Sequence, residues 1–228
     1  MVRRRRLFTK FVDVRDTGSL STRLRRRRFA FFEALLDRLP KPVSILDVGG
    51  TPDFWQMMDS SEREDIEITL LNLIAIQRPP ARFRCVVGDA RNLTRFGDRE
   101  FDVVFSNSVI EHVGNYADQQ KMAEGVRRVG KRYFVQTPNR NFPIEPHFLV
   151  PLFQFLPIAA RAWLLNHFDL GWHKRVPDYK AAKREVEAVR LLTEGDLIQL
   201  FPDSVLYRER FFGFTKSLTA YHGWDIPQ

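Results

Sequence analysis

The chain has 228 residues, of which 44% are apolar, 13% aromatic and 28% charged. This length suits one α/β domain with a modest extension, and the composition excludes a disordered or disulfide-stapled protein. Its one cysteine, Cys85, excludes an internal disulfide and a thiolate-rich zinc site. No apolar run reaches the roughly 20 residues of a membrane-spanning helix. The first residues also lack the apolar segment of a secretory signal, so we expect a reduced cytoplasmic location.

Positive charge is concentrated at the start of the chain. Residues 1–40 hold 12 Arg and Lys against 4 Asp and Glu, which accounts for the whole net charge of +8. Two arginine clusters, Arg3–Arg6 and Arg23 with Arg25–Arg28, could neutralise the phosphates of RNA or of anionic lipid headgroups. The alternative is a solvated basic face on an N-terminal extension and first helix.

The pattern of the next hundred residues predicts alternating strands and helices. Apolar residues at helical spacing predict a helix from Thr22 to Leu39, which Pro40 and Pro42 end. Short apolar runs then predict five strands, at residues 43–48, 66–73, 83–87, 101–105 and 132–136. A short helix at 52–60 and a longer one at 116–129 lie between them. The spacing indicates a doubly wound, mostly parallel sheet.

From Pro143 to about residue 170 the chain changes to an apolar, proline-containing segment with one short helix at 159–168. An insertion after a fifth strand lies near the carboxyl ends of the strands, where ligands of parallel sheets bind. We interpret this segment either as a lid-like pocket wall or as extra core packing.

The last part of the chain predicts one more helix and a hairpin. A capping box at Thr193 opens a helix to about Phe201, and the runs 204–211 and 214–221 form an antiparallel pair. We therefore predict a basic extension and helix at 1–40 and a single domain at 41–228 that contains the lid-like insertion.

Polar residues and glycines follow three of the predicted strands. Asp47-Val48-Gly49-Gly50 ends the first strand, Gly88-Asp89-Ala90 follows the third, and Ser106-Asn107 ends the fourth. Glycine lets the backbone approach a ligand closely, and the N-terminus of a following helix offers free N–H groups. The pattern predicts a nucleotide-like ligand at the carboxyl edge of the sheet.

On these residues the chain resembles the class I S-adenosylmethionine-dependent methyltransferases, particularly the type 11 group, over roughly residues 43–139 and the closing hairpin. The resemblance implies a Rossmann-like, seven-stranded, mostly parallel sheet with a C-terminal antiparallel hairpin. It implies S-adenosyl-L-methionine as cofactor, with its methionine part at Asp47 and the Gly49-Gly50 turn. By the same resemblance, Asp89 with Ala90 binds adenine and Asn107 lies near the methionine end.

Two positions depart from the family pattern. Thr51 and Asp53 stand where further glycines are expected, and Asn72 replaces the acid that takes both ribose hydroxyls. Asparagine can accept one hydrogen bond and donate another, so we expect weaker cofactor binding rather than none. A dinucleotide-binding dehydrogenase also uses a glycine turn, but the missing third glycine, Asn72 and the position of Asp89 favour the methyltransferase.

The candidate catalytic residues lie after the fourth strand and in the lid. A hydroxyl acceptor is helped by a base, and the candidates are Glu111 with His112, and Glu145 with His147. The run from Ser108 to His112, followed by His147, also resembles an incomplete Glu-x-x-Glu-His metal pattern of certain O-methyltransferases. Because Ser108 replaces the first glutamate, we expect catalysis without a metal ion.

The leading prediction is a methyltransferase that transfers a methyl group to oxygen or nitrogen of a small molecule. The apolar lid favours an acceptor with a hydrophobic part. One alternative is an RNA methyltransferase that uses the basic N-terminus. The other is a non-catalytic or membrane-surface protein on the same scaffold, attached peripherally to a membrane.

Overall fold

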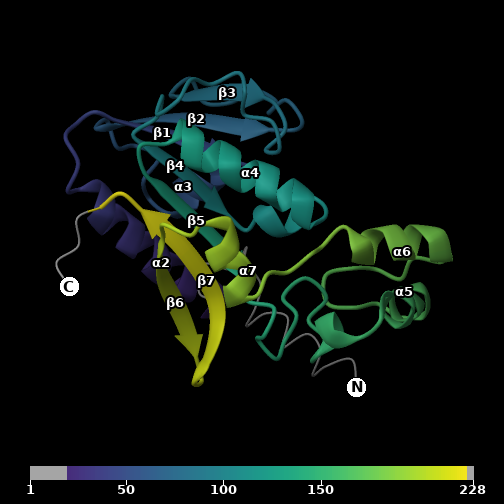
Figure 1. Ribbon diagram of the computed structural model, residues 1–228. Helices are drawn as coiled ribbons and strands as arrows, with labels where there is room; N and C mark the ends of the chain where they lie inside the picture. The colour runs from purple at the N-terminus through teal and green to yellow at the C-terminus, as the bar shows by residue number, and fades with distance from the viewer. Residues whose placement is uncertain (1–19, 225–228) are drawn as a thin grey trace.

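The computed structural model describes residues 20–224, and their centre is one seven-stranded sheet (Figure 1). The strand order is β3-β2-β1-β4-β5-β7-β6. The strands are β1 (Val43–Val48), β2 (Ile66–Asn72), β3 (Phe83–Val87), β4 (Val103–Asn107), β5 (Tyr133–Pro138), β6 (Val205–Phe211) and β7 (Phe214–His222). The first five are parallel, and β7 runs antiparallel to both β5 and β6. The predicted fold class is confirmed.

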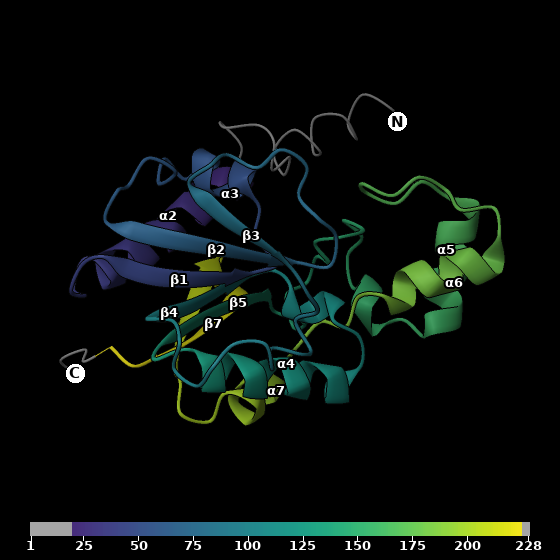
Figure 2. The ribbon, with the colours of Figure 1, turned by 90° about the horizontal axis from the view of Figure 1, so that it is seen from above.

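Helices cover both faces of this sheet (Figure 2). One face carries α2 (Leu20–Leu36) and α3 (Pro52–Met57), and the other carries α4 (Tyr116–Val129) and α7 (Glu194–Leu200). Two 3₁₀ turns, η1 (Ile110–His112) and η2 (Phe153–Phe155), follow β4 and β5 along the chain. No helix in the described part of the chain is both long and apolar enough to cross a membrane.

The core beneath α2 is rich in aromatic side chains. Phe29, Phe32 and Leu36 recur at helical spacing along α2 and are buried against the sheet. The ring of Phe32 lies 4.6 Å from that of Phe105 on β4 and 4.9 Å from that of Phe134 on β5, measured between centroids. These contacts fix the first helix onto the two central strands.

The segment after β5 forms a small unit beside the sheet. Helices α5 (Ile158–His167) and α6 (Tyr179–Glu187) lie side by side, away from the other helices (Figures 1 and 2). They share a core of their own, made by Phe148, Phe153, Ala162, Leu165, Leu170, Ala182 and Val186. We call residues 143–187 the lid unit. It extends beyond the predicted 143–170 because α6 belongs to it.

Helix α6 was not predicted from the sequence, although an N-cap residue and buried residues at helical spacing are present. Asp178 caps the helix by accepting a hydrogen bond from the Ala181 N–H, and Ala182 and Val186 lie one turn apart on its buried side. The helix has few large apolar residues among its charged ones, so its sequence resembles that of a loop.

Replacing Phe32 by alanine tests the aromatic core. We expect Phe32→Ala to lower the free energy of unfolding by roughly 3–5 kcal/mol, because it removes a fully buried ring and leaves a cavity. Urea denaturation followed by circular dichroism measures this change. Phe212, which is 86% exposed, is the control, and Phe212→Ala should change stability by less than about 0.5 kcal/mol. Equal effects of the two substitutions would contradict this account.

Candidate functional site

The polar residues that end the parallel strands meet at one edge of the sheet. Asp47 on β1 is in register with Leu70 on β2 and Phe105 on β4, so the three strands end close together. Asn72 ends β2 and Asn107 ends β4. The arrowheads of β2 and β3 point toward the side of the molecule where α5 and α6 lie (Figure 1). The predicted ligand edge is therefore the edge that faces the lid unit.

Asp47 lies beneath the glycine turn. It is 1% exposed, and its Oδ2 accepts a hydrogen bond of 2.8 Å from the indole N–H of Trp55. A Cβ at position 50 would lie 1.7 Å from this oxygen, so only glycine fits there. Gly49 has φ +81°, and its missing Cβ makes room for Val109. The turn is thus built by close approach of the backbone to Asp47 and Val109.

The second oxygen of Asp47, Oδ1, is buried and has no hydrogen-bond partner among the described residues. Burial raises the pKa of Asp47 to about 7, although the bond from Trp55 opposes this. Trp55 was not anticipated as a site residue, since nothing in the local sequence signals that a helix side chain will reach back to β1.

Asn72 at the end of β2 and Asp89 just after β3 are the residues predicted to bind ribose and adenine. The Asn72 side chain donates a 2.7 Å hydrogen bond to the Gly50 carbonyl, which leaves its Oδ1 as the free acceptor. Asp89 accepts several hydrogen bonds from Arg91, and these bonds hold the pKa of Asp89 below its ordinary value. Ala90 is half-buried beside it. A ligand at Asp89 therefore meets an ionised carboxylate that already has one partner.

Asn107 is held by a residue of the N-terminal helix. The Arg28 guanidinium donates to Asn107 Oδ1 at 3.0 Å and pairs with Glu209 on β6 at 2.9 Å. Arg28 is 8% exposed, so it is not part of a solvated basic face as the sequence suggested. It turns inward because Glu209 offers it a buried counter-charge. The other predicted cluster, Arg3–Arg6, lies outside the described residues.

The three predicted catalytic residues come together beyond β4. Glu111, His112 and His147 each offer a ligand atom, and these atoms lie within 4.8 Å of one another. The two imidazole rings meet edge to face with centroids 4.9 Å apart. His147 Nδ1 lies 2.7 Å from Glu145 Oε1, whose other oxygen accepts from the Phe148 N–H. Residues 35 positions apart in sequence thus form one polar cluster.

Glu111 is the buried member of this cluster. It is fully buried, its Oε2 accepts a 3.0 Å bond from the Thr137 hydroxyl, and its Oε1 has no partner in the described part of the chain. Burial raises the pKa of Glu111 to about 7. Ser108, where the metal pattern has an acid, donates its hydroxyl to Gln136 on β5 instead. The spacing of the cluster would suit a metal ion, so catalysis without one stays a prediction.

The two histidines have opposite electrostatic surroundings. Burial alone lowers the pKa of His147, but the hydrogen bond to Glu145 and the charges of Glu145 and Glu111 outweigh it and raise the pKa. Partial desolvation and the neighbouring His147 lower the pKa of His112. The His112 side chain is the exposed member of the cluster. At neutral pH, the cluster therefore pairs a neutral His112 with a His147 that binds its proton more tightly.

Nuclear magnetic resonance of the histidine rings tests this assignment. A pH titration should give His147 a pKa above the ordinary 6.5 and His112 a pKa below it. In Glu145→Gln, the pKa of His147 should fall, because both the charge and the charged acceptor are lost. Two histidines that titrate together near 6.5 would contradict the arrangement.

Comparison with known proteins gives a family match over part of the chain. A methyltransferase domain family model matches residues 63–133. Two uncharacterised proteins of Mycobacterium tuberculosis are 28% identical over 137 residues, which cover 55% of this chain and 46% of each relative. The match therefore spans less than half the length of these curated relatives.

Solved structures show the same fold at low identity. A protein from Bordetella parapertussis has a TM-score of 0.54 at 12% identity, over 95% of this chain and 78% of its own. The 1,6-didemethyltoxoflavin-N1-methyltransferase of Burkholderia thailandensis, solved with its substrate and S-adenosylhomocysteine, has a TM-score of 0.50 at 16% identity. That match covers 96% of this chain and 87% of the Burkholderia enzyme. The chain therefore matches a methyltransferase domain family over residues 63–133 and shares the fold of the Burkholderia enzyme.

Proposed function

We propose that this enzyme binds S-adenosylmethionine at the carboxyl edge of β1–β4 and transfers its methyl group to oxygen or nitrogen of a small acceptor. One observation carries the proposal: Asp47, Asn72, Asp89 and Asn107 stand at the ends of four neighbouring strands, in the order that the family uses. The methyltransferase domain match over 63–133 includes three of these four residues, all but Asp47. The Burkholderia relative with bound S-adenosylhomocysteine supports the choice of cofactor.

The residues present fit this cofactor. The unpartnered Asp47 Oδ1 can accept from the methionine ammonium after a small opening of the glycine turn. Asp89 can accept from the adenine amine, and Asn72 Oδ1 from one ribose hydroxyl. Asn72 has one side-chain oxygen where the family pattern has two, and its amide group already donates to Gly50, so cofactor affinity should be modest.

His147 is the proposed base and Glu145 its positioning residue. When bound, the cofactor supplies an electrophilic methyl group for in-line displacement. With Nδ1–H donated to Glu145, neutral His147 presents Nε2 to take the proton from an acceptor hydroxyl or amine. His112 and the buried Glu111 line the same cluster and orient the acceptor. Their function in catalysis is part of the proposal.

The surface of the lid unit favours an acceptor with an apolar part. Eight large hydrophobic side chains between residues 152 and 179 are each at least 37% exposed, which is a high density for a surface. They are Leu152, Phe155, Leu156, Ile158, Trp163, Phe168, Trp172 and Tyr179. The same surface fits peripheral attachment to a membrane, which stays an alternative to a purely cytoplasmic location. For the RNA alternative, the burial of Arg28 removes one cation of the second cluster.

Calorimetric titration with S-adenosylhomocysteine tests the cofactor site. We expect wild-type protein to bind it, NADH not to bind, and Asp89→Ala to weaken binding about tenfold through loss of a charge-assisted hydrogen bond. Arg91→Ala is the matched control: it breaks the same ion pair but keeps the carboxylate, so binding should be retained.

Two outcomes would count against the proposal in different ways. A folded wild-type protein that binds neither S-adenosylhomocysteine nor S-adenosylmethionine favours the non-catalytic scaffold. Binding that is unchanged in Asp89→Ala keeps the cofactor but removes Asp89 from its site.

Metal addition tests catalysis without a metal ion. We expect metal-free protein to show no thermal stabilisation by millimolar Mg²⁺ or Mn²⁺, because Ser108 stands where the metal pattern has an acid and donates its hydroxyl to Gln136, so the cluster offers a single carboxylate to a hard cation. Differential scanning fluorimetry measures the shift, with EDTA as the blank. A stabilisation that disappears in Glu111→Gln would show that the cluster binds the ion.

A further inference from the structure

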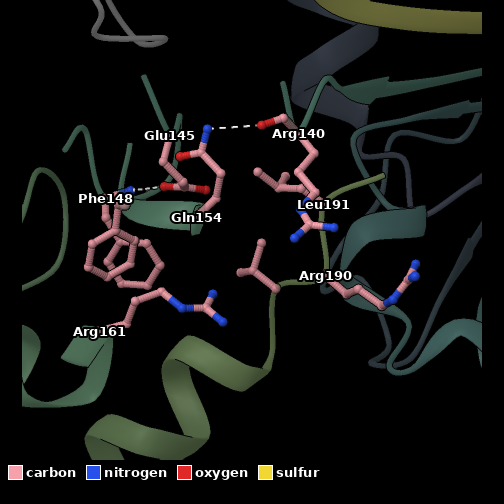
Figure 3. Close-up of a pocket in the computed structure, with 9 residues that line it drawn as sticks. Arg140, Glu145, Phe148, Gln154, Arg161, Arg190 and Leu191 are labelled. Atoms are coloured by element: carbon pink, nitrogen blue, oxygen red, sulfur yellow. Dashed lines mark hydrogen bonds between the residues drawn. The ribbon is translucent and has the colours of Figure 1, made fainter. Parts of the chain in front are cut away.

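A second group of polar side chains lies beyond the histidines, in a pocket of about 210 Å³. The pocket is formed by the segment after β5, helix α5 and the linker between α6 and α7 (Figure 3). Its polar lining residues are Arg140, Glu145, Gln154, Arg161 and Arg190. A water molecule occupies about 30 Å³ in the liquid, so the pocket has room for part of a ligand.

One of the three arginines is already engaged with the protein. The Arg190 guanidinium donates to Gln119, lies 3.5 Å from Asp196 and sits 4.8 Å above the Tyr116 ring. In Figure 3 its side chain points away from Arg140 and Arg161. Arg190 therefore contributes to the wall of the pocket, but its positive charge lies at Gln119 and Asp196, outside the pocket.

Arg140 and Arg161 have no such partners. Within residues 20–224, no carboxylate lies at ion-pair distance from either guanidinium, and their side chains extend from opposite sides toward the same space in Figure 3. Arg161 is half-buried, and its Nε is enclosed without an acceptor. Burial and the nearby Arg140 lower the pKa of Arg161, while Glu145 opposes the shift. Two like charges are thus held close together, and the carboxylates of Glu145 and Glu187 near Arg161 do not reach ion-pair distance.

Glu145, the one acid in the pocket lining, is committed to other groups. Its Oε1 lies 2.7 Å from His147 Nδ1, and its Oε2 accepts from the Phe148 N–H at 2.6 Å. Because the Glu145 carboxylate interacts with His147, the positive charges of Arg140 and Arg161 exceed the negative charge in the pocket. The Gln154 amide donates to the carbonyls of Arg140 and Phe142, so its unpartnered Oε1 can accept from a hydroxyl or N–H.

We infer that this pocket binds an anionic group of the methyl acceptor, a carboxylate or a phosphate, through Arg140 and Arg161. The planar guanidinium is suited to both anions because it donates two parallel hydrogen bonds. Such an anion would supply the acceptor that Arg161 lacks and separate the two positive charges. As the pocket of a methyl acceptor, the inference rests on the proposed function.

The pocket is placed to deliver the rest of the acceptor to the histidines. Glu145 lines it and also holds His147, while the Ala188 carbonyl, next to the lining residue Val189, interacts with His112. A molecule anchored by its anion can therefore extend past Glu145 toward His147 and the cofactor edge. Combined with the apolar surface of the lid unit, the site fits an amphiphilic anion.

Binding of small anions to protein saturated with S-adenosylhomocysteine tests the inference. The probes are inorganic phosphate, phenyl phosphate and benzoate, with neutral benzyl alcohol for comparison, in a buffer free of other oxyanions. Calorimetry should show binding of at least one anion to wild type and none of benzyl alcohol. Comparison of phenyl phosphate with benzoate identifies the preferred anion.

Arginine variants locate the binding. Arg140→Gln and Arg161→Gln should each weaken anion binding at least tenfold, because each replaces a charged donor by a neutral, shorter polar side chain. Arg38→Gln, at an exposed arginine near the end of α2, should leave it unchanged. All four proteins should bind S-adenosylhomocysteine equally, which shows that the variants are folded.

Three results would overturn the inference: no anion binds wild type, benzyl alcohol binds as well as benzoate, or the two pocket variants bind anions like wild type. A different result would overturn the proposed function instead. If anions bind and depend on Arg140 and Arg161 while S-adenosylhomocysteine does not bind, the anion site stands and the methyl-transfer reaction fails.

Discussion

The site depends on two carboxylates that the fold buries at the carboxyl edge of the sheet. Asp47 and Glu111 are each buried, and each has one oxygen bonded, to Trp55 or Thr137, and one with no hydrogen-bond partner among residues 20–224. Raising the pKa of Glu111 from 4.5 to about 7 corresponds to roughly 3 kcal/mol against its ionised form. Stability therefore falls as the pH rises from about 4.5 toward 7, where unfolded carboxyls are ionised and the buried ones are not. In the proposed site, donors on the bound ligand form hydrogen bonds to these two buried oxygens.

Sequence analysis predicted the framework that places these groups because the signals are local. A buried parallel strand is a short apolar run, and the run from Val43 to Val48 ends where Asp47 and the glycines follow. The same reasoning located β3, α4 and the final hairpin to within about two residues. The proposed cofactor-binding residues follow from this reasoning alone, since parallel strands bring their carboxyl ends to one edge.

Contacts between distant residues could not be predicted in this way. Arg28 pairs with Glu209 across 181 positions, and its place in a run of four arginines suggested a solvated face. Trp55 gave no sign that its indole would bond Asp47. Arg140 lies before the lid unit and Arg161 within it, so only the folded chain brings them to one pocket. The proposed acceptor pocket is formed by residues that only the tertiary structure brings together. The proposed cofactor-binding residues, in contrast, can be read from the sequence at the end of each strand.

The attachment of the lid unit to the core explains how these two halves keep their alignment. Where the chain leaves the sheet after β5, the Arg140 N–H donates to the Leu192 carbonyl. Where the chain returns, the Arg190 N–H donates to the Glu111 carbonyl, and the Gln119 amide bridges the carbonyls of Ile110 and Arg190. Both stems are therefore tied to each other and to the turn that carries Glu111 and His112. Because the lid unit is held at both stems, the arginine pocket stays at a fixed distance from the histidines. We therefore expect the proposed site to select its acceptor by length.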